Sequence, residues 1–191
     1  MVFPILGANT ESASYEIANS IRINHNNAAY LSRSISSTGS ERIMTVSVWV
    51  KRSQLDHEHC IFSNKTSSTG INAMKLAFFS NNKLDWTVAT TGDTNYSITT
   101  NALFRDVAAW YHIVATVDTT QGTSSNRMKL YVNGAQVTSL SVASYPSQND
   151  DLRLSNSSYP HTIGEDPRDN TNFDGYIAEM HCLDGTAYDA S

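Results

Sequence analysis

Residues 110–134 contain two runs of alternating apolar and polar side chains, separated by a polar loop. Apolar residues recur at every second position in residues 110–118 and again in 128–132, which is the period of a strand with one buried face. Residues 121–126 hold a glycine and no apolar side chain, as expected for a loop. Asn133-Gly134 then supplies two residues that tolerate positive φ in a type I′ hairpin turn. The stretch predicts paired antiparallel strands.

Runs of the same kind recur along the chain, with turn-forming residues between them. In residues 44–51, for example, Met44, Val46, Val48 and Val50 form one apolar face. No window of helical length carries an apolar stripe. Many short strands in 191 residues predict an all-β fold, an antiparallel β-sandwich of the jelly-roll type, in a single domain spanning residues 1–191. The predicted strands are residues 20–23, 29–33, 44–51, 60–63, 74–80, 83–90, 96–99, 110–118, 128–132, 137–140, 161–163 and 175–183, with a tight hairpin turn at 80–83.

Composition narrows the class of partner. The chain is 40% hydrophobic and only 16% charged, with a net charge of −5, so nothing steers it toward nucleic acid or anionic lipid. No apolar run approaches the roughly 20 residues that span a bilayer. The apolar N-terminal residues follow no basic segment, so they lack the pattern of a secretory signal peptide. We therefore expect no nucleic-acid partner and no membrane insertion.

Cysteine and histidine residues offer two candidate covalent or metal sites. Cys60 and Cys182 are too few for a disulfide framework. Both fall in predicted strands, so we interpret them as buried free thiols, with a single bridge between them as the alternative. His57, His59 and Cys60 form an H-x-H-C motif of zinc-ligand type. A zinc site draws further ligands from a second cluster, for which His181 with Cys182 is a remote candidate, so the motif alone does not establish a metal site.

The sequence lacks the patterns of common hydrolases and transferases. Retaining glycoside hydrolysis needs two carboxylates about 5–5.5 Å apart, which nearby residues on one strand face can supply. The run typical of that arrangement is absent, and Asp56 with Glu58 lies in a predicted loop. There is no G-x-S-x-G elbow, P-loop or dinucleotide fingerprint. The chain is therefore predicted not to be an enzyme, with a polysaccharide hydrolase as the last-ranked alternative.

Four segments in order along the chain resemble one family. They are SIRINHNNAAYLSR (residues 20–33), MTVSVWVKRS (44–53), WYHIVATVDTTQGTSSNRMKLYVNG (110–134) and HTIGEDPRDNTNFDGYIAEMHCLDGTAYDAS (161–191). Together they are similar to the laminin-G-like, concanavalin-A-like lectin and glucanase domains, and they cover nearly the whole chain. The resemblance implies an antiparallel sandwich, the concanavalin-A-like jelly roll, which agrees with the strand pattern.

A narrower resemblance is carried by YLSR, WVKRS, AWYHIV, YPSQN and FDGYIAEMHCLDG. These motifs are similar to a group of marine bacteriophage virion proteins with lectin-like domains. The resemblance implies a virion protein on a tail fibre or the head surface, with other virion proteins and host surface glycans as partners, and an oligomer in the particle. The family pattern runs on past Ser191, which indicates a fragment or a minimal member. The alternative role is a purely structural capsid decoration or fibre-assembly domain.

Calcium is the one cofactor that the resemblance suggests. Glu165, Asp166 and Asp169 follow an Ile-Gly pair in a predicted loop, and they resemble the acidic cluster that helps bind calcium in the pentraxin branch of this fold. Loops rich in carboxylate oxygens suit this hard cation. That branch also has an Asp-Asn pair before an earlier strand, and the corresponding place here reads Ile71-Asn72. Because one carboxylate is missing, a hydrated acidic loop is the alternative.

Glycan contact is predicted in loops that combine aromatic rings with amide side chains. Aromatic faces bind the C–H surface of sugars, and amides bind their hydroxyl groups. Trp49, Trp86 and Trp110 fall within predicted strands and are assigned to the core, and His112 is interpreted as a satisfied core or sheet-face histidine. We predict a non-enzymatic, lectin-like module that binds surface glycans. The candidate ligand residues are Tyr145, Gln148, Asn149, Tyr159, Asn172 and Phe173.

Overall fold

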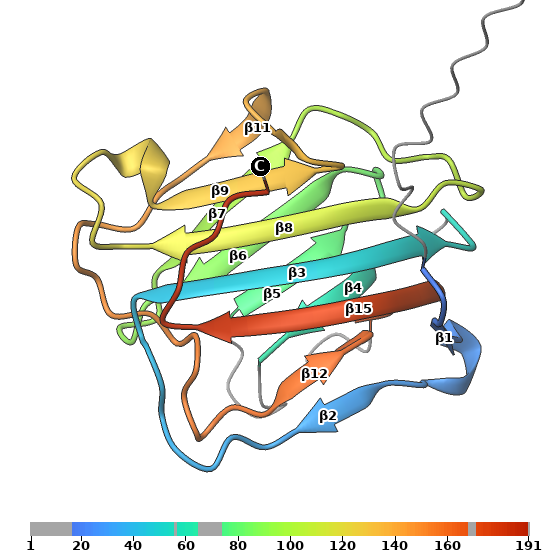
Figure 1. The fold of residues 1–191 in the computed structure, drawn as a ribbon, viewed down its shortest axis with the longest axis horizontal. Coiled ribbons are helices and arrows are strands. Elements are labelled where there is room, and N and C mark those ends of the chain that lie inside the picture. Colours follow the sequence, from blue (N-terminus) through green and yellow to red (C-terminus); the bar gives the residue numbers. More distant parts are fainter. Residues whose placement is uncertain (1–16, 56, 65–73, 168–170, 191) are drawn as a thin grey trace, which may run out of the picture.

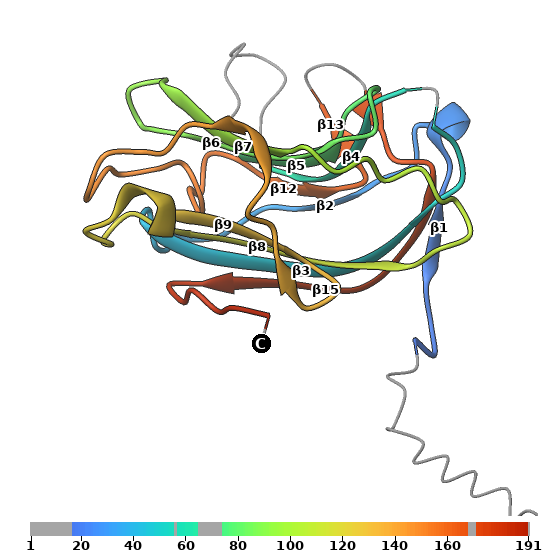
Figure 2. The same ribbon diagram turned by 90° about the horizontal axis from the view of Figure 1, so that it is seen from above.

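Two antiparallel β-sheets pack face to face in the computed structural model, which describes residues 17–55, 57–64, 74–167 and 171–190 (Figure 1 and Figure 2). The six-stranded sheet has the order β1 (Ile21–Ile23), β15 (Gly175–Asp184), β3 (Ile43–Arg52), β8 (Tyr111–Asp118), β9 (Met128–Val132) and β10 (Ala135–Gln136). The seven-stranded sheet has the order β11 (Leu140–Ala143), β7 (Asn95–Thr100), β6 (Leu84–Ala89), β5 (Met74–Phe78), β4 (His59–Ser63), β12 (His161–Ile163) and β2 (Leu31–Arg33). The predicted all-β antiparallel sandwich is confirmed.

Small elements complete the described part of the chain. A two-stranded sheet joins β13 (Glu165–Asp166) to β14 (Thr171–Asn172), and two 3₁₀ helices are η1 (His25–Asn27) and η2 (Ser124–Asn126). Figure 2 shows β13 on the outer side of the seven-stranded sheet. No helix in the described residues has the length and apolar character of a membrane span.

The core lies between the two sheets and follows the alternation in the sequence. On β3, Met44, Val46, Val48 and Val50 are fully buried, as their shared strand face predicts. They belong to the same buried cluster as Trp86 of the opposite sheet. Burying one side chain of this size contributes about 1.5–3 kcal/mol. The apolar side chains on the inner face of β3 therefore contribute strongly to the packing between the sheets. Because side chains alternate along a strand, the intervening residues of β3 point to the outer face.

The predicted strands agree with the observed ones within two residues at each end, except one. The exception is residues 137–140, for which the prediction is wrong. The Asn-Gly turn sends Ala135–Gln136 back along β9, so that Val132 and Ala135 are paired. The chain then crosses to the other sheet, where Leu140 begins β11 beside β7. The short strands β10, β13 and β14 were not expected.

The turn residues adopt the backbone that their sequence predicts. Asn133 and Gly134 have φ angles of 51° and 81°, which satisfies the type I′ requirement for positive φ at both positions. Asn82 has φ of 66° in the turn between β5 and β6. Glycine and asparagine are the residues that adopt this left-handed region at least cost. Both hairpins are confirmed.

The two cysteines are free thiols, so no bridge joins them. Cys60 is fully buried on β4 as predicted, and burial raises the pKa of its thiol well above the ordinary value. Cys182 is exposed on β15, and its predicted burial is wrong. The reason is that β1 pairs with only Gly175–Ile177 of β15, so it does not cover the later part of that strand's edge.

The C-terminal residues 185–190, which we call the C-terminal strap, cross the outer face of the six-stranded sheet. Figure 1 shows the strap passing in front of β3 and β8, and Figure 2 shows it outside this sheet. The Thr45 hydroxyl donates a hydrogen bond of 2.7 Å to the Thr186 carbonyl and accepts one of 2.9 Å from the Tyr188 N–H. The strap therefore covers the part of this face around Thr45, and its Ala190 lies close to Gly134 in the turn after β9.

Candidate functional site

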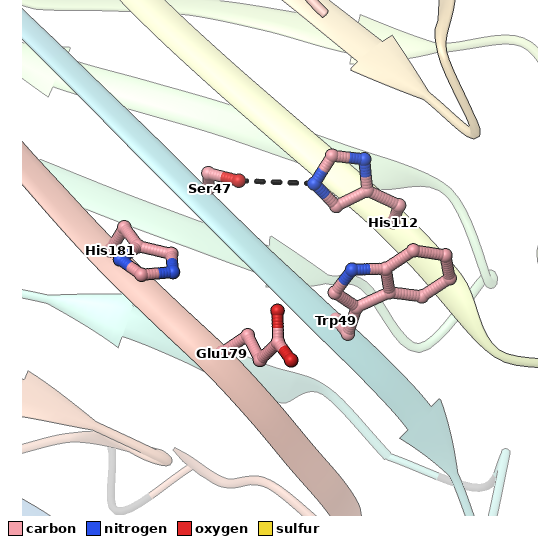
Figure 3. Close-up of a pocket in the computed structure, with 5 residues that line it drawn as sticks. All are labelled: Ser47, Trp49, His112, Glu179 and His181. Carbon is pink, nitrogen blue, oxygen red and sulfur yellow. Dashed lines mark hydrogen bonds between the residues drawn. The ribbon is translucent and has the colours of Figure 1, made fainter. Parts of the chain in front are cut away.

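A pocket of about 320 Å³ opens on the uncovered part of that face, between β15, β3 and β8. We call it the outer-face pocket. Figure 3 shows that its side chains come from three adjacent strands and point toward one space. Its lining residues are Ser47, Trp49, His112, Glu179 and His181.

Strand alternation and register explain how β3 and β8 form this pocket. Ser47 and Trp49 alternate with the core residues of β3, so they project from the outer face. Trp49 is the register partner of His112 on β8, and their rings stack with centroids 4.9 Å apart. A hydrogen bond of 3.0 Å joins Ser47 Oγ to His112 Nε2 (Figure 3). The tryptophan and imidazole rings thus form one fixed, half-buried wall.

A β-bulge in β15 supplies the acidic group. The pairing of β15 with β3 shifts between Ala178 and His181, and Glu179 has φ of 47°, in the left-handed region. A non-glycine residue in this conformation costs about 1–2 kcal/mol. Bulges re-aim side chains beside functional sites. In Figure 3 the Glu179 carboxylate lies between Trp49 and His181, so the bulge directs a charge into the pocket.

The chemistry of the outer-face pocket suits a polyhydroxylated ligand. Burial lowers the pKa of His112, so its imidazole is neutral at pH 7. The half-buried Trp49 ring offers an apolar face, while the Ser47 hydroxyl, the imidazoles and the Glu179 carboxylate can exchange hydrogen bonds. A small apolar surface surrounded by a few convergent polar groups is typical of a ligand site.

The arrangement does not form a Ser-His-acid catalytic triad. In such a triad the acid accepts a hydrogen bond from the histidine nitrogen that does not face the serine. In Figure 3 the second ring nitrogen of His112 points away from Glu179. Ser47 therefore has a hydrogen-bonded partner in His112 but lacks the relay that would activate it as a nucleophile.

Two of the three predicted calcium residues are adjacent on a short strand. Glu165 and Asp166 form β13 rather than a loop, and Asp169 lies outside the described residues. Asp166 is buried and its carboxylate lies 3.7 Å from the ammonium of Lys75. No group of three metal-ligating side chains suited to a metal ion occurs among the described residues. Among the described residues the Asp166 carboxylate faces the ammonium of Lys75, and calcium binding by this segment stays a prediction.

Lys75 is the centre of a buried polar cluster on the outer face of the seven-stranded sheet. Its ammonium donates a hydrogen bond of 2.7 Å to Glu58. Burial by itself lowers the pKa of Lys75, but the hydrogen bond and the charge of Glu58 outweigh it, so the pKa is raised. Nearby, burial raises the pKa of Asp85. Hydrogen bonds of 2.6 Å from the Thr87 and Thr99 hydroxyls shift this pKa in the opposite direction. Lys75 and Glu58 therefore neutralise each other, and two hydroxyl groups satisfy the Asp85 carboxylate.

The predicted ligand loop of residues 145–149 lies away from the outer-face pocket, between β11 and β12. Gln148 donates a hydrogen bond of 3.1 Å to the Thr120 carbonyl, and Tyr145 packs against the core. Tyr159 lies in the same connection, and the guanidinium carbon of Arg153 sits over its ring, 5.6 Å from the ring centroid. Asn149 is exposed at a left-handed position. Asn172 and Phe173 belong to another segment, where Asn172 pairs with Glu165 and Phe173 is hydrogen-bonded to Gly164.

Two predicted ligand residues are buried. Asn172 is only 3% exposed and Phe173 is fully buried. The N–H of Phe173 donates to the Gly164 carbonyl at 2.8 Å, and its ring packs edge-on against His59. Phe173 is therefore a core residue that closes the end of the sandwich, and it cannot stack on a ligand at the surface.

The predicted core position of the tryptophans holds for only one of them. Trp86 is fully buried, whereas Trp49 and Trp110 are half-buried on the outer face of the six-stranded sheet. The signal was present in the sequence, because Trp49 alternates with the apolar face of β3. His112 is confirmed as a sheet-face histidine. Glu179 and His181 had no local signal, since the bulge that directs them depends on cross-strand register.

The H-x-H-C motif contributes to ring packing. His57 stacks on His59 with centroids 4.1 Å apart, and the ring of His25 from η1 lies tilted against His57 at 4.0 Å. The N–H of Asp174 donates to His59 Nδ1 at 3.1 Å. These histidines belong to no group of three metal-ligating side chains among the described residues.

Comparison with known proteins identifies the class of fold. A laminin-G-like family model described as "Concanavalin A-like lectin/glucanases superfamily" matches residues 24–189. A search of curated protein sequences finds no match.

Three solved structures illustrate the likeness of fold. The carbohydrate-binding module CBM40 of a Ruminococcus gnavus IT-sialidase, bound to α2,3-sialyllactose, aligns with a TM-score of 0.59 at 13% identity, over 85% of this chain and 95% of that one. A heptameric SAP-like pentraxin of Limulus polyphemus gives 0.54 at 17% identity, over 80% and 68%. The binding domain of Paraclostridial Mosquitocidal Protein 1 gives 0.59 at 17% identity, over 90% and 41%.

Proposed function

The chain belongs to the concanavalin A-like lectin/glucanase superfamily, and from that premise we propose that it is a non-enzymatic carbohydrate-binding module whose ligand site is the outer-face pocket. The observation that carries the proposal is the Trp49 ring, held half-exposed beside His112 and Glu179 on a strand whose other face is core. The superfamily also contains glucanases, but glycoside hydrolysis uses a pair of carboxylates, and the residues that line the outer-face pocket supply one, Glu179, which supports the binding role.

The size of the outer-face pocket supports a single sugar ring as its occupant. Its volume of about 320 Å³ lies at the lower end of the range for small-molecule sites. The sugar would place its C–H face on Trp49 and its hydroxyls toward Ser47 and Glu179. No metal is needed for these contacts, so calcium is not part of the proposed site.

We further propose that the module is displayed on a bacteriophage virion and recognises host surface glycans, as part of an oligomer with other virion proteins. The support is the sequence resemblance of segments such as WVKRS and FDGYIAEMHCLDG to that group. The rival within the same setting is a structural capsid or fibre-assembly domain, which would need no sugar site.

A glycan array tests the carbohydrate-binding role. We expect the wild-type chain to bind a defined set of glycans, with and without calcium. Trp49→Ala is expected to weaken binding at least about tenfold, because truncating an aromatic anchor typically costs more than 1 kcal/mol. Tyr30→Ala, which removes a 48% exposed tyrosine outside the outer-face pocket, is the matched control and should bind as wild type.

The array also separates the rival functions. An array without any hit, for a protein shown to be folded by circular dichroism, would contradict the carbohydrate-binding role and favour the structural one. Binding that Trp49→Ala leaves intact would move the glycan site away from the outer-face pocket. Release of reducing sugar from a bound polysaccharide would contradict the non-enzymatic assignment.

A further inference from the structure

A second aromatic surface adjoins the outer-face pocket. Tyr176 of β15 and Trp110, which directly precedes β8, have ring centroids 6.5 Å apart at an angle of 57°. Tyr176 is 38% exposed and Trp110 is half-buried. Two large rings that lean together on an open sheet face are not needed for the core, which lies on the other side of the sheet. We call this pair the second platform.

Register fixes where the second platform lies. Tyr176 is the cross-strand partner of Lys51, and Lys51 follows Trp49 by two residues on the same face of β3. Trp110 likewise precedes His112 by two residues. Two residues along a strand span about 7 Å. The second platform is therefore the next position along the strands from the Trp49–His112 wall, on the same open face.

The second platform is held in place from the side of β1. Arg22 is the cross-strand partner of Tyr176, and its guanidinium lies 5.4 Å from the Tyr176 ring centroid. The same guanidinium donates a hydrogen bond of 2.8 Å to the buried carboxylate of Asp174. Because Arg22 is anchored at both contacts, the tyrosine ring is ordered before any ligand arrives. Preordered aromatic groups bind with less loss of conformational entropy.

The two ends of the outer face of the six-stranded sheet differ in what covers them. Beyond Ser47, the face is covered by the C-terminal strap, which is hydrogen-bonded to Thr45. Beyond Trp49, the next residues along the strands are Lys51, Tyr176 and Trp110, and Tyr176 is 38% exposed. A ligand longer than one sugar can therefore extend from the outer-face pocket over the second platform.

We propose that the second platform is a second sugar subsite, so that the domain binds an extended oligosaccharide chain across both positions rather than a single terminal sugar. The inference rests on the proposed function. One sugar ring occupies the outer-face pocket against Trp49, and a following ring stacks on Tyr176 and Trp110. Lys51, the cross-strand partner of Tyr176, donates to the hydroxyls of the ring on the second platform.

The test is affinity as a function of ligand length. Chito-, cello- and laminari-oligosaccharides of one to six sugar units are titrated into the full chain, and binding is followed by NMR, which reaches the weak affinities of single sugars. In the series that binds, we expect affinity to rise at least about tenfold between one and four units, the equivalent of about 1.4 kcal/mol.

Two variants test whether the second platform causes the gain in affinity with ligand length. Tyr176→Ala and Trp110→Ala are each expected to weaken the four-unit ligand about tenfold and to leave the one-unit ligand within about twofold, as expected for loss of a separate aromatic anchor. Trp49→Ala should weaken both ligands. Tyr30→Ala is the matched control for an exposed tyrosine, and thermal unfolding checks that each variant is folded.

The outcomes separate this inference from the proposed function. Equal affinity for one and four units, or full retention of the length effect in Tyr176→Ala and Trp110→Ala, overturns the second subsite and leaves the outer-face pocket in place. No binding of any oligosaccharide, together with an array that has no hit, overturns the proposed function and this inference with it.

Discussion

The outer faces of the two sheets both carry polar side chains, but they use them in opposite ways. On the seven-stranded sheet, Lys75 is buried and neutralised by Glu58 and Asp166. On the six-stranded sheet, Trp49 is half-buried beside Glu179 in an open pocket. Charges that satisfy one another and are shielded from water maintain structure, whereas an aromatic ring beside an accessible charge is arranged for a ligand. The comparison teaches that burial and pairing, not polarity, distinguish the two faces.

The largest effect that would test this comparison is on stability. Lys75→Ala leaves the carboxylates of Glu58 and Asp166 without their shared cation in a buried place, and breaking such a pair typically costs about 3–5 kcal/mol. Urea unfolding measures the loss. We expect a large fall in unfolding free energy and, at temperatures where the variant is folded, unchanged glycan binding. A variant as stable as wild type, or one that is folded but loses binding, would contradict the structural role of the cluster.

A smaller effect of opposite sign is expected at the bulge. Glu179→Gly removes a side chain from a left-handed position, which should stabilise the fold by up to about 1 kcal/mol because glycine adopts this conformation without strain. The same change removes the carboxylate from the outer-face pocket and should weaken glycan binding. Differential scanning calorimetry and NMR titration measure the two effects. A variant that is less stable, or that binds as well as wild type, would count against a strained functional bulge.

A pH effect of similar or smaller size is expected from two histidines. Burial lowers the pKa of both His161 and His112, and at His161 a hydrogen bond to the Leu154 carbonyl partly offsets the shift. Below the unfolded pKa of about 6.5, the unfolded chain takes up protons that the folded chain resists. Stability should therefore fall as the pH drops below this value and be constant above it. Urea unfolding at pH 7.5 and 5.5 tests this, and the double variant H112Q/H161Q should lose most of the difference.

The smallest effect should come from metal removal. The outer-face pocket has one carboxylate, and the Asp166 carboxylate on β13 faces the ammonium of Lys75. Glycan affinity and unfolding temperature should therefore be the same in EDTA and in calcium. NMR titration and calorimetry in the two buffers make the comparison. A rise in affinity or in unfolding temperature with calcium would contradict this expectation and support the predicted site at Glu165, Asp166 and Asp169.

The fold was largely predictable from the sequence because its signals are local. Alternation of Met44, Val46 and Val48 identifies a strand face without knowledge of its partner, and Asn133-Gly134 encodes its own turn. The one wrong strand, residues 137–140, lies where the chain changes sheet. The pairing of such a segment depends on where neighbouring strands lie, which no local pattern contains.

The candidate site was poorly predictable because it is assembled from distant segments. Glu179 enters the pocket through a register shift between β15 and β3, and Tyr176 is ordered by Arg22 from the other end of the chain. Phe173 was assigned to a ligand because it follows a polar loop, yet it inserts into the core. Trp49 and His112 did have a readable signal, since strand alternation placed both on a sheet face, but for Trp49 the general tendency of tryptophan to be buried outweighed that signal.

The most direct test of the outer-face assignment uses the three tryptophans of the chain as built-in reporters. Their indole N–H signals are assigned by single Trp→Phe variants and followed by ¹H–¹⁵N NMR as the oligosaccharide that binds best is added. We predict that the signals of Trp49 and Trp110 shift together in a saturable manner, while that of the buried Trp86 does not. Saturable binding that leaves the Trp49 and Trp110 signals unmoved would contradict the claim that this face is the glycan site.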